Sequence, residues 1–282
     1  MVEYHADDFG FFPRQSRRII EAADEGAVNA ISIIVNSEYY VECIDMLGNR
    51  PLKTALHLNI VSGRPVSEAM VDILTNKDGE FGLSFMTLLI VSYNALIRDR
   101  YKSALKAEIL AQIRRYSQFF SSPLRIDSHC HFHMIPVVFD ALIEVIREND
   151  ISVEYIRFPA EKLLPGVHGF VRPVNLVKTV VLDILCLRNR NKHSETIKSM
   201  EKRAFFGILH SGCLNINVVR NIQKHIEEDC EILFHPGGCY EIENLQSVKN
   251  TGDLRFWSSE DRNKELQLLK TLRAETENVE NH

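Results

Sequence analysis

The sequence predicts an α/β fold of the barrel type, in which mostly parallel strands alternate with helices. Between Val2 and Ile60, apolar strand-like stretches alternate with helix-like stretches, and this order requires crossover connections between parallel strands. The length of 282 residues fits one barrel-type domain of about 250 residues without a second hydrophobic core. We therefore expect a single domain over residues 1–273, followed by a flexible tail at 274–282.

The first elements show the alternation most clearly. Helical spacing of Ile19, Ala22 and Ala23 predicts an amphipathic helix that Gly26 ends. In chain order, the pattern predicts strands at Val2–Ala6, Ala30–Val35 and Ala55–Ile60, and helices at Gln15–Glu25 and Tyr39–Leu47.

The middle of the chain is expected to leave this alternation for a turn-rich excursion at residues 63–85. The apolar stretch Leu83–Ile97 is shorter than the roughly 18 residues of a membrane span, so it predicts a buried helix. Further helices are expected at Ser92–Phe119, Val137–Asn149, Val174–Leu187, Val218–Glu228 and Ser259–Arg273, and further strands at Ser152–Arg157, Gly207–Leu209 and Glu231–Phe234. Residues 160–202 are expected to form an insertion that covers one mouth of the site.

Composition excludes several classes of protein. A net charge of −5 argues against a nucleic acid partner, and the basic run of Arg188, Arg190 and Lys192 is expected to be a solvated surface segment. We expect no signal peptide and no membrane partner. Six cysteines without a CxxC pair argue against a structural zinc site and a disulfide scaffold, so the sequence indicates a cytoplasmic protein.

The stretch Ile126–Pro136 concentrates metal-capable side chains. Read as one strand, it would place alternate residues on a shared face. Such a face is costly to bury unless a metal or a substrate satisfies it. The residues on that face would be Asp127, His129, His131 and His133.

Four polar sites recur at the same position of the predicted strands. The pair Asp7-Asp8, His57, His129 and His235 each lie at or near the carboxyl end of a strand, where α/β barrels form their active sites. Taken singly, each has a structural explanation, because acidic pairs cap helices and lone histidines occur in cores and turns. Their shared position favours one converging site.

The residue types indicate the chemistry of that site. One carboxylate and two imidazoles can hold a divalent ion with open positions for water and substrate. A second carboxylate could act as the general base, and a histidine from another strand could protonate a leaving amine. Such a set serves amide or ester hydrolysis.

The same residues carry a resemblance to a known family. The blocks Ala6-Asp7-Asp8-Phe9-Gly10, Leu56-His57-Leu58, Asp127-Ser128-His129-x-His131-x-His133-x-x-Pro136 and Glu231-x-x-x-His235-Pro236 resemble, in order, those of the YdjC-like carbohydrate deacetylases. Two further segments, Arg157-x-Pro159 and Arg262-x-x-Glu265-Leu266, are similar to weaker family blocks.

The resemblance implies a distorted β/α barrel that removes the N-acetyl group from an N-acetylglucosamine-containing sugar or short oligosaccharide. It also implies that Asp8, His57 and His129 bind the metal, that Asp7 is the general base and that His235 is the catalytic acid. Magnesium is the ion that the resemblance implies, whereas an imidazole-rich ligand set by itself suggests zinc or another transition metal.

The chain departs from the family pattern next to the acidic pair. It has His5 where the family usually has asparagine, and Phe11-Phe12 where a basic or hydroxyl residue is frequent. These departures bear on metal preference and on the rim of the pocket. Five residues remain candidates for orienting ligands or contacting substrate: His5, His131, His133, Arg157 and Glu231.

Two other functions stay open at this level. The chain could be a barrel protein that binds a sugar or a metal without catalysis. It could also be a metal-dependent phosphoesterase, which would need more positive charge near the site. A homodimer is possible, because barrels often associate through their outer helices.

Overall fold

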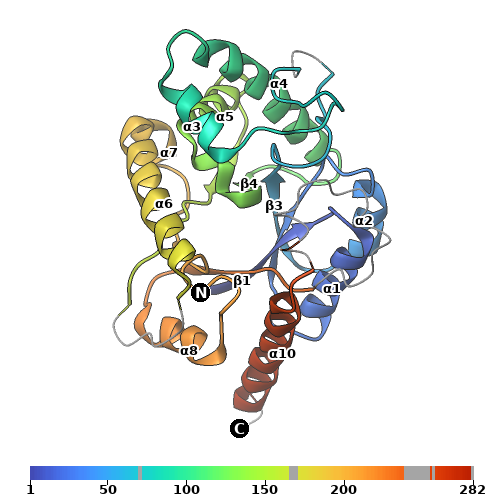
Figure 1. Cartoon of the computed structure of the whole chain (residues 1–282). Helices are drawn as coiled ribbons and strands as arrows, with labels where there is room; N and C mark the ends of the chain where they lie inside the picture. Colours follow the sequence, from blue (N-terminus) through green and yellow to red (C-terminus); the bar gives the residue numbers. More distant parts are fainter. Residues whose placement is uncertain (69–71, 165–170, 238–254, 256–257, 281–282) are drawn as a thin grey trace.

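The structure is a computed structural model that describes residues 1–68, 72–164, 171–237, 255 and 258–280. At its centre is a sheet of seven strands in the order β5-β4-β3-β2-β1-β7-β6, and every neighbouring pair is parallel. The sheet curls into a half-barrel with helices around it (Figure 1). The predicted fold class, a distorted barrel of parallel strands, is confirmed.

Most strands lie close to the predicted positions, but β6 precedes the expected Gly207–Leu209 strand and β4 ends well before Pro136. Their bounds are β1 Val2–Phe9, β2 Ala30–Ile33, β3 Lys53–Leu58, β4 Leu124–Ser128, β5 Val153–Ile156, β6 Ala204–Phe206 and β7 Cys230–Phe234. Parallel neighbours bring all their carboxyl ends to one edge of the sheet. The structure therefore collects the residues that end β1, β3, β4 and β7 at that edge.

The helices connect the strands and cover the outside of the sheet. Their bounds are α1 Pro13–Asp24, α2 Tyr40–Leu47, α3 Phe85–Tyr93, α4 Arg98–Tyr116, α5 Pro136–Glu148, α6 Pro173–Lys192, α7 Ser194–Ile197, α8 Ile216–His225 and α10 Asp261–Glu280. Helix α10 continues beyond residue 274, where we expected a tail, and residues 281–282 lie outside the described residues.

The segment predicted as an insertion, 160–202, contains α6 and α7, while its residues 165–170 lie outside the described part of the chain. Its basic run lies at the carboxyl end of α6, where the side chains of Arg188 and Lys192 both contact Asp140. The expectation that the segment covers one mouth of the site stays a prediction. No described helix has the length and apolar content that crossing a membrane requires.

The helix predicted within Leu83–Ile97 is present, but it is shorter than expected and is buried on one side only. Helix α3 ends at Tyr93, and only one of its sides is covered, by packing of Leu88 and Val91 in the core. On the opposite side, Met86 is 59% exposed and Ile90 is 63% exposed. A helix that is apolar all round carries no periodic signal, so hydrophobicity alone could not show which side faces outward.

The single strand predicted for Ile126–Pro136 was wrong. Strand β4 ends at Ser128, and a 3₁₀ segment, η1 (His129–Met134), follows it. Inside η1, Cys130 and His131 adopt φ angles of 52° and 57°. This left-handed backbone interrupts the two-residue period, so the three histidines of the stretch point to different surroundings.

Candidate metal centre

Two adjacent carboxylates reach the same place at the end of β1. In a regular strand, Asp7 and Asp8 would point to opposite faces. Asp8 instead has a φ of 70°, and the pairing of β1 with β2 shifts in register between Ala6 and Phe9. As a result, Asp8 Oδ1 lies 3.3 Å and Asp7 Oδ2 lies 3.9 Å from Nε2 of His57.

A glycine allows the turn that follows. Gly10 has a φ of 91°, and a Cβ atom at this position would lie 2.6 Å from the carbonyl oxygen of Ile34. Only glycine fits that backbone without displacing β2. The Asp-Asp-Phe-Gly block thus bends the backbone at the end of β1 and directs both carboxylates inward.

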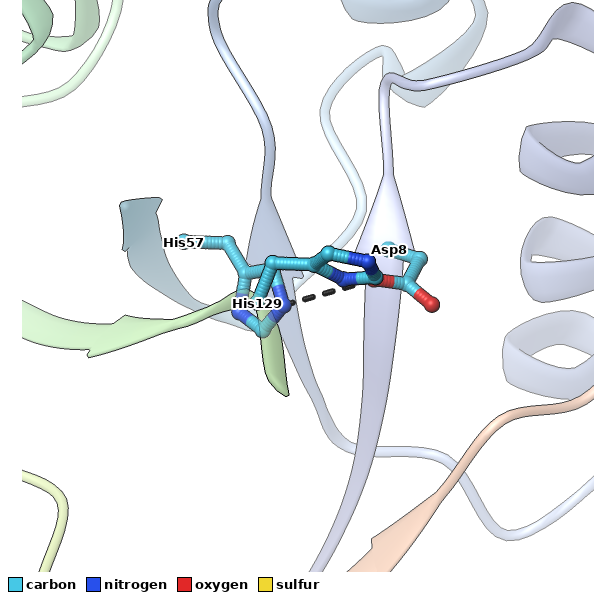
Figure 2. A group of neighbouring side chains, drawn as sticks. All are labelled: Asp8, His57 and His129. Carbon is cyan, nitrogen blue, oxygen red and sulfur yellow. Dashed lines mark hydrogen bonds and ion pairs between the residues drawn. The ribbon is translucent and has the colours of Figure 1, made fainter. Parts of the chain in front are cut away.

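Figure 2 shows the three side chains that the resemblance assigns to the metal. Asp8 comes from β1, His57 from β3 and His129 from the start of η1, and one potential ligand atom of each lies within 4.8 Å of the other two. The dashed line marks the hydrogen bond that His129 Nδ1 donates to Asp8 Oδ1 over 2.7 Å. All three residues are buried.

The electrostatics of this group fit a divalent cation. Burial opposes ionisation of Asp8, but His129 and His57 outweigh it and hold the pKa of Asp8 well below its usual value. Its second oxygen, Oδ2, is buried and has no hydrogen-bond partner among the described residues. A charged oxygen left without a partner in the interior is costly. A cation held by this carboxylate and the two imidazoles would satisfy it.

A second carboxylate orients His57. The Nδ1 atom of His57 donates to Asp127 Oδ1 over 2.6 Å, so Nε2 is directed toward Asp8. Asp127 also accepts a hydrogen bond from the hydroxyl of Ser32. Burial lowers the pKa of His57, but Asp7 and Asp127 raise it more, to about 9. In metal sites, the ring nitrogen that does not bind the metal often donates to a carboxylate, and this bond fixes the orientation of the imidazole.

Sequence reasoning did not assign these two supporting residues to the site. Asp127 was placed on the polar face of the predicted strand, but its bond to His57 depends on the register of β3 and β4, where His57 pairs with Asp127. Ser32 gave only a weak signal, as one hydroxyl in an otherwise apolar strand.

Changing Asp127 to asparagine is expected to weaken metal binding by about 10- to 100-fold, because the amide cannot supply the charge that orients and polarises His57. Competition with a chromophoric chelator would measure the affinity. Asp140→Asn is a matched control, since Asp140 also binds a histidine, His193, over 2.8 Å outside the centre. Equal affinities of Asp127→Asn and the unmodified protein would contradict this role.

The candidate general base is held by a buried arginine. Arg157, directly after β5, donates two hydrogen bonds to Asp7, over 2.7 and 2.9 Å. Its Nη2 also lies 2.8 Å from Asp127 and 2.5 Å from Glu231. The bidentate contact fixes the plane of the Asp7 carboxylate beside the candidate metal-binding group.

Deeper in the half-barrel, further acidic and histidine side chains cluster. Two groups have metal-binding spacing: Glu3, His5 and Glu231, and His5, Asp7 and Asp127. Arg157 already contacts three of these carboxylates, and Arg125 contacts Glu3. Positive charge is therefore present there without an ion, and we interpret this region as a buried ionic support for the centre.

His5 belongs to that support. Its Nε2 lies 2.6 Å from the Ser32 hydroxyl and 3.8 Å from Asp7 Oδ1, while its Nδ1 lies 3.0 Å from Glu3. It is completely buried. The structure thus brings His5 to Asp7 and to the hydroxyl that supports Asp127, and it is absent from the group of Asp8, His57 and His129.

The two later histidines of η1 have separate surroundings. His133 bonds to the Ser128 hydroxyl over 2.5 Å and to the carbonyl oxygen of Arg157 over 2.8 Å, and burial lowers its pKa to about 4. His131 meets the ring of Phe205 edge-on at 5.9 Å. Neither belongs to the candidate metal-binding groups found among the described residues.

The candidate acid, His235, follows β7 at the same edge of the sheet. Its backbone N–H donates to Glu265 Oε2 over 2.6 Å, and Glu265 in turn binds Arg262. Burial and the nearby charge of Arg262 lower the pKa of His235, although Asp8 and Asp7 act in the opposite direction. The late segment with Arg262 and Glu265, noted in the sequence as a weaker block, thus positions the backbone of His235.

Glu231 was considered as a residue that could orient His235 or fill a buried hydrogen-bonding role. Its carboxylate accepts a hydrogen bond from the Tyr155 hydroxyl over 2.7 Å and contacts Arg157. These contacts fit a buried hydrogen-bonding role, the second of the two alternatives.

A cavity of about 580 Å³ lies among the loops at the carboxyl edge of the sheet. The loops that follow β1, β2 and β3 form it, and Phe132 of η1 closes one side. Its wall combines aromatic and polar side chains, among them Phe11, Phe12, Tyr39, Phe81, Asn36, Arg64, Asn76 and Glu80. The side chains of Asp8, His57 and His129 do not line it, but its loops leave the same edge of the sheet. The size is that of a small-molecule site.

The fold and this centre together define an α/β half-barrel protein with a potential cation site at the carboxyl edge of its sheet. A family model described as YdjC-like protein matches residues 4–276. The chain therefore belongs to the YdjC-like family.

Curated relatives are 26–31% identical to the chain within the matched segments. A carbohydrate deacetylase of Mus musculus is 31% identical over 162 residues, which are 56% of this chain and 50% of the relative. A carbohydrate deacetylase of Geobacillus stearothermophilus is 28% identical over 59% of this chain and 64% of its own length. The matches thus span about half to two thirds of these relatives.

A solved structure supports the fold over nearly the whole chain. It is that of an Enterococcus faecalis protein provisionally described as a cellobiose-phosphate cleavage protein, with a TM-score of 0.64 at 15% identity. The alignment covers 98% of this chain and 94% of the other. At this identity the likeness concerns the fold alone.

Proposed function

We propose that this protein is a metal-dependent carbohydrate deacetylase that removes the N-acetyl group from an N-acetylglucosamine-containing sugar or short oligosaccharide. One observation carries the proposal: the buried group of Asp8, His57 and His129 lies directly beside Asp7, a second carboxylate held by Arg157. Membership of the YdjC-like family and the relatives named carbohydrate deacetylase support the same activity.

In this proposal Asp8, His57 and His129 hold one divalent cation. When bound, the cation would acidify water and stabilise the oxyanion of amide hydrolysis. Magnesium is suggested by the family resemblance, whereas two imidazoles and one carboxylate suit zinc or another transition metal. A metal-binding assay with both kinds of ion decides between them.

The protein side chains then divide the proton transfers between them. Asp7, oriented by two hydrogen bonds from Arg157, accepts a proton from the attacking water. The water oxygen bonds to the acetyl carbon, and the bond between that carbon and the sugar nitrogen breaks. His235 donates a proton to the departing nitrogen, so acetate and the free amino sugar leave.

The buried charges disfavour the phosphoesterase alternative. That chemistry needs cationic groups free to bind phosphate. Arg157, the arginine in contact with Asp7, is fully buried and already contacts Asp7, Asp127 and Glu231.

Release of acetate tests the proposal directly. Purified protein would be incubated with N-acetylglucosamine and its short oligomers, with chelator and after return of magnesium or zinc. We expect acetate release that the chelator abolishes and one ion restores. Binding of the same sugars without acetate release under any ion would instead favour the non-catalytic alternative.

Metal affinity should depend on pH in the direction set by His57 and His129. A protonated imidazole cannot bind a metal. Against the effect of burial, Asp7 and Asp127 raise the pKa of His57 to about 9, and Asp8 helps to hold the pKa of His129 well above its usual value. Apparent affinity should therefore rise by about 100-fold per pH unit between pH 6 and 8, with release of about two protons per ion. Calorimetry in buffers of different ionisation enthalpy would count those protons, and a pH-independent affinity would contradict the prediction.

A further inference from the structure

His5 faces four carboxylates in the interior of the half-barrel. Its Nδ1 lies 3.0 Å from Glu3 and 3.4 Å from Glu231. Its Nε2 lies 3.8 Å from Asp7 and 3.9 Å from Asp127. The imidazole and all four carboxylates are buried. Because a carboxylate offers acceptor atoms alone, a ring in these surroundings is satisfied only as a hydrogen-bond donor.

The Ser32 hydroxyl lies between His5 and Asp127. Its oxygen is 2.6 Å from Nε2 of His5, and it donates to Oδ2 of Asp127. Asp127 is paired with Arg157 over 2.8 Å, so its carboxylate accepts this bond. A hydroxyl has a single proton to donate, and the Ser32 oxygen must therefore accept from His5. The directions of these bonds place a proton on Nε2 of His5.

The other ring nitrogen of His5 points toward two acceptors. Glu3, at 3.0 Å from Nδ1, also accepts a hydrogen bond from Arg125, and Glu231 lies 3.4 Å from the same nitrogen. A lone pair on Nδ1 would face the negative oxygens of both carboxylates, which is unfavourable in a buried region. Both ring nitrogens of His5 therefore act as donors.

A continuous path of hydrogen bonds leads from His5 to a proposed metal ligand. His5 donates to Ser32, which donates to Asp127. The other oxygen of Asp127 accepts from Nδ1 of His57 over 2.6 Å. The four residues come from four neighbouring strands, β1, β2, β4 and β3. Because Asp127 is held at both oxygens, its carboxylate stays directed at His57.

We propose that His5 is a positioning residue for the metal centre, and that it acts on His57 through Ser32 and Asp127. This inference rests on the proposed function, in which His57 binds the ion. His5 itself touches neither the ion nor the substrate in this role. Without its N–H, the buried oxygen of Ser32 would lack a donor, and the serine side chain could adopt another rotamer that no longer supports Asp127.

Two substitutions separate this role from one in packing alone. Glutamine can place an amide N–H near the position of Nε2 and donate to Ser32, but it fills the space of the ring poorly. Phenylalanine fills that space and has no donor. We expect His5→Phe to weaken metal affinity by about tenfold, the lower end of the range for a partner behind a ligand, and His5→Gln to retain most of the affinity. A role in packing alone would give the reverse order.

A double-mutant cycle tests the path itself. Ser32→Ala removes the link between His5 and Asp127, so adding His5→Phe to it should cost little further metal affinity. Ser92→Ala is the matched control, because Ser92 is also buried and its hydroxyl also donates and accepts, to Leu88 and from Val137. In that background His5→Phe should have its full effect. Additive losses from His5→Phe and Ser32→Ala would overturn the proposed path.

Nitrogen-15 spectra of the metal-free protein test the donor assignment without any ion. The ring signals of His5, identified by their loss in His5→Gln, should be those of two protonated nitrogens. The proposal is overturned if Nε2 carries no proton.

Competition between the protein and a chromophoric chelator for zinc and for magnesium measures the affinities. If His5→Phe binds the ion as tightly as the unmodified protein does, the positioning role of His5 is refuted and the proposed metal centre stands. If the unmodified protein binds neither ion, the proposed function and the role of His5 are both refuted. The two failures therefore give different results.

Discussion

Changing Asp7 to asparagine is expected to lower kcat for acetate release by about 10²- to 10⁴-fold, the usual contribution of a positioned general base. Asparagine keeps the shape of the side chain but cannot accept the proton of the attacking water. Arg157 would still be held by Asp127 and Glu231, so the fold and the metal-binding group should persist. Metal affinity is therefore expected to stay close to that of the unmodified protein.

The experiment pairs steady-state kinetics with a metal titration of the same preparation. Asp24→Asn is the matched control. Asp24 also accepts two hydrogen bonds from one arginine, because Nε and Nη2 of Arg50 donate to it over 2.7 and 2.8 Å, but this pair lies at the surface. It should keep full activity. Full activity in Asp7→Asn would remove Asp7 from the role of base, and loss of metal from that variant would make Asp7 a ligand.

The parts of the structure that the sequence predicted are those set by regular periodicity. Strands β1, β2 and β3 alternate with α1 and α2 as expected, and the carboxyl ends of the parallel strands bring Asp8, His57 and His129 together. Convergence of the three follows from topology, because residues at the ends of parallel strands share an edge whatever their distance along the chain.

The parts that it missed depend on backbone irregularity. A two-residue period cannot foresee that Asp8 has a φ of 70°, which turns two adjacent carboxylates to one side. The same limit applies to Cys130 and His131, whose left-handed backbone separates the histidines of η1. Both departures occur at the candidate centre, where strained backbone is most often retained for function.

The sequence named Arg157 and Glu231 as candidates for orienting ligands, but it could not show their partners. The contacts of Arg157 with Asp7, Asp127 and Glu231 join the end of β5 to three other strands. Such a cluster depends on the order of the strands in the sheet and on their register. Neither can be predicted from the local sequence. Burial of so many charges is tolerated only because each finds a partner, so the cluster makes the centre rigid as well as charged.

Removal of His129, the proposed ligand in η1, is expected to abolish metal binding. His129→Ala should weaken affinity by more than about 100-fold, since loss of a residue that merely supports a ligand already costs about 10- to 100-fold. The change also removes the hydrogen bond to Asp8 Oδ1 and leaves the buried carboxylate of Asp8 with the contact to His57. Acetate release should fall to the level seen with chelator, and added metal should not restore it.

His193→Ala separates this result from a general loss of structure. His193 also binds a carboxylate, Asp140, over 2.8 Å through a ring nitrogen, but it lies at the end of α6 outside the centre. Both variants lose one imidazole–carboxylate bond, so comparable thermal melting without metal is expected. Added metal should raise the melting temperature of His193→Ala alone, because only a protein that binds the ion gains stability from it. If metal stabilises His129→Ala to the same degree, His129 is not a ligand, and the centre would have to be built from Asp8, His57 and other side chains.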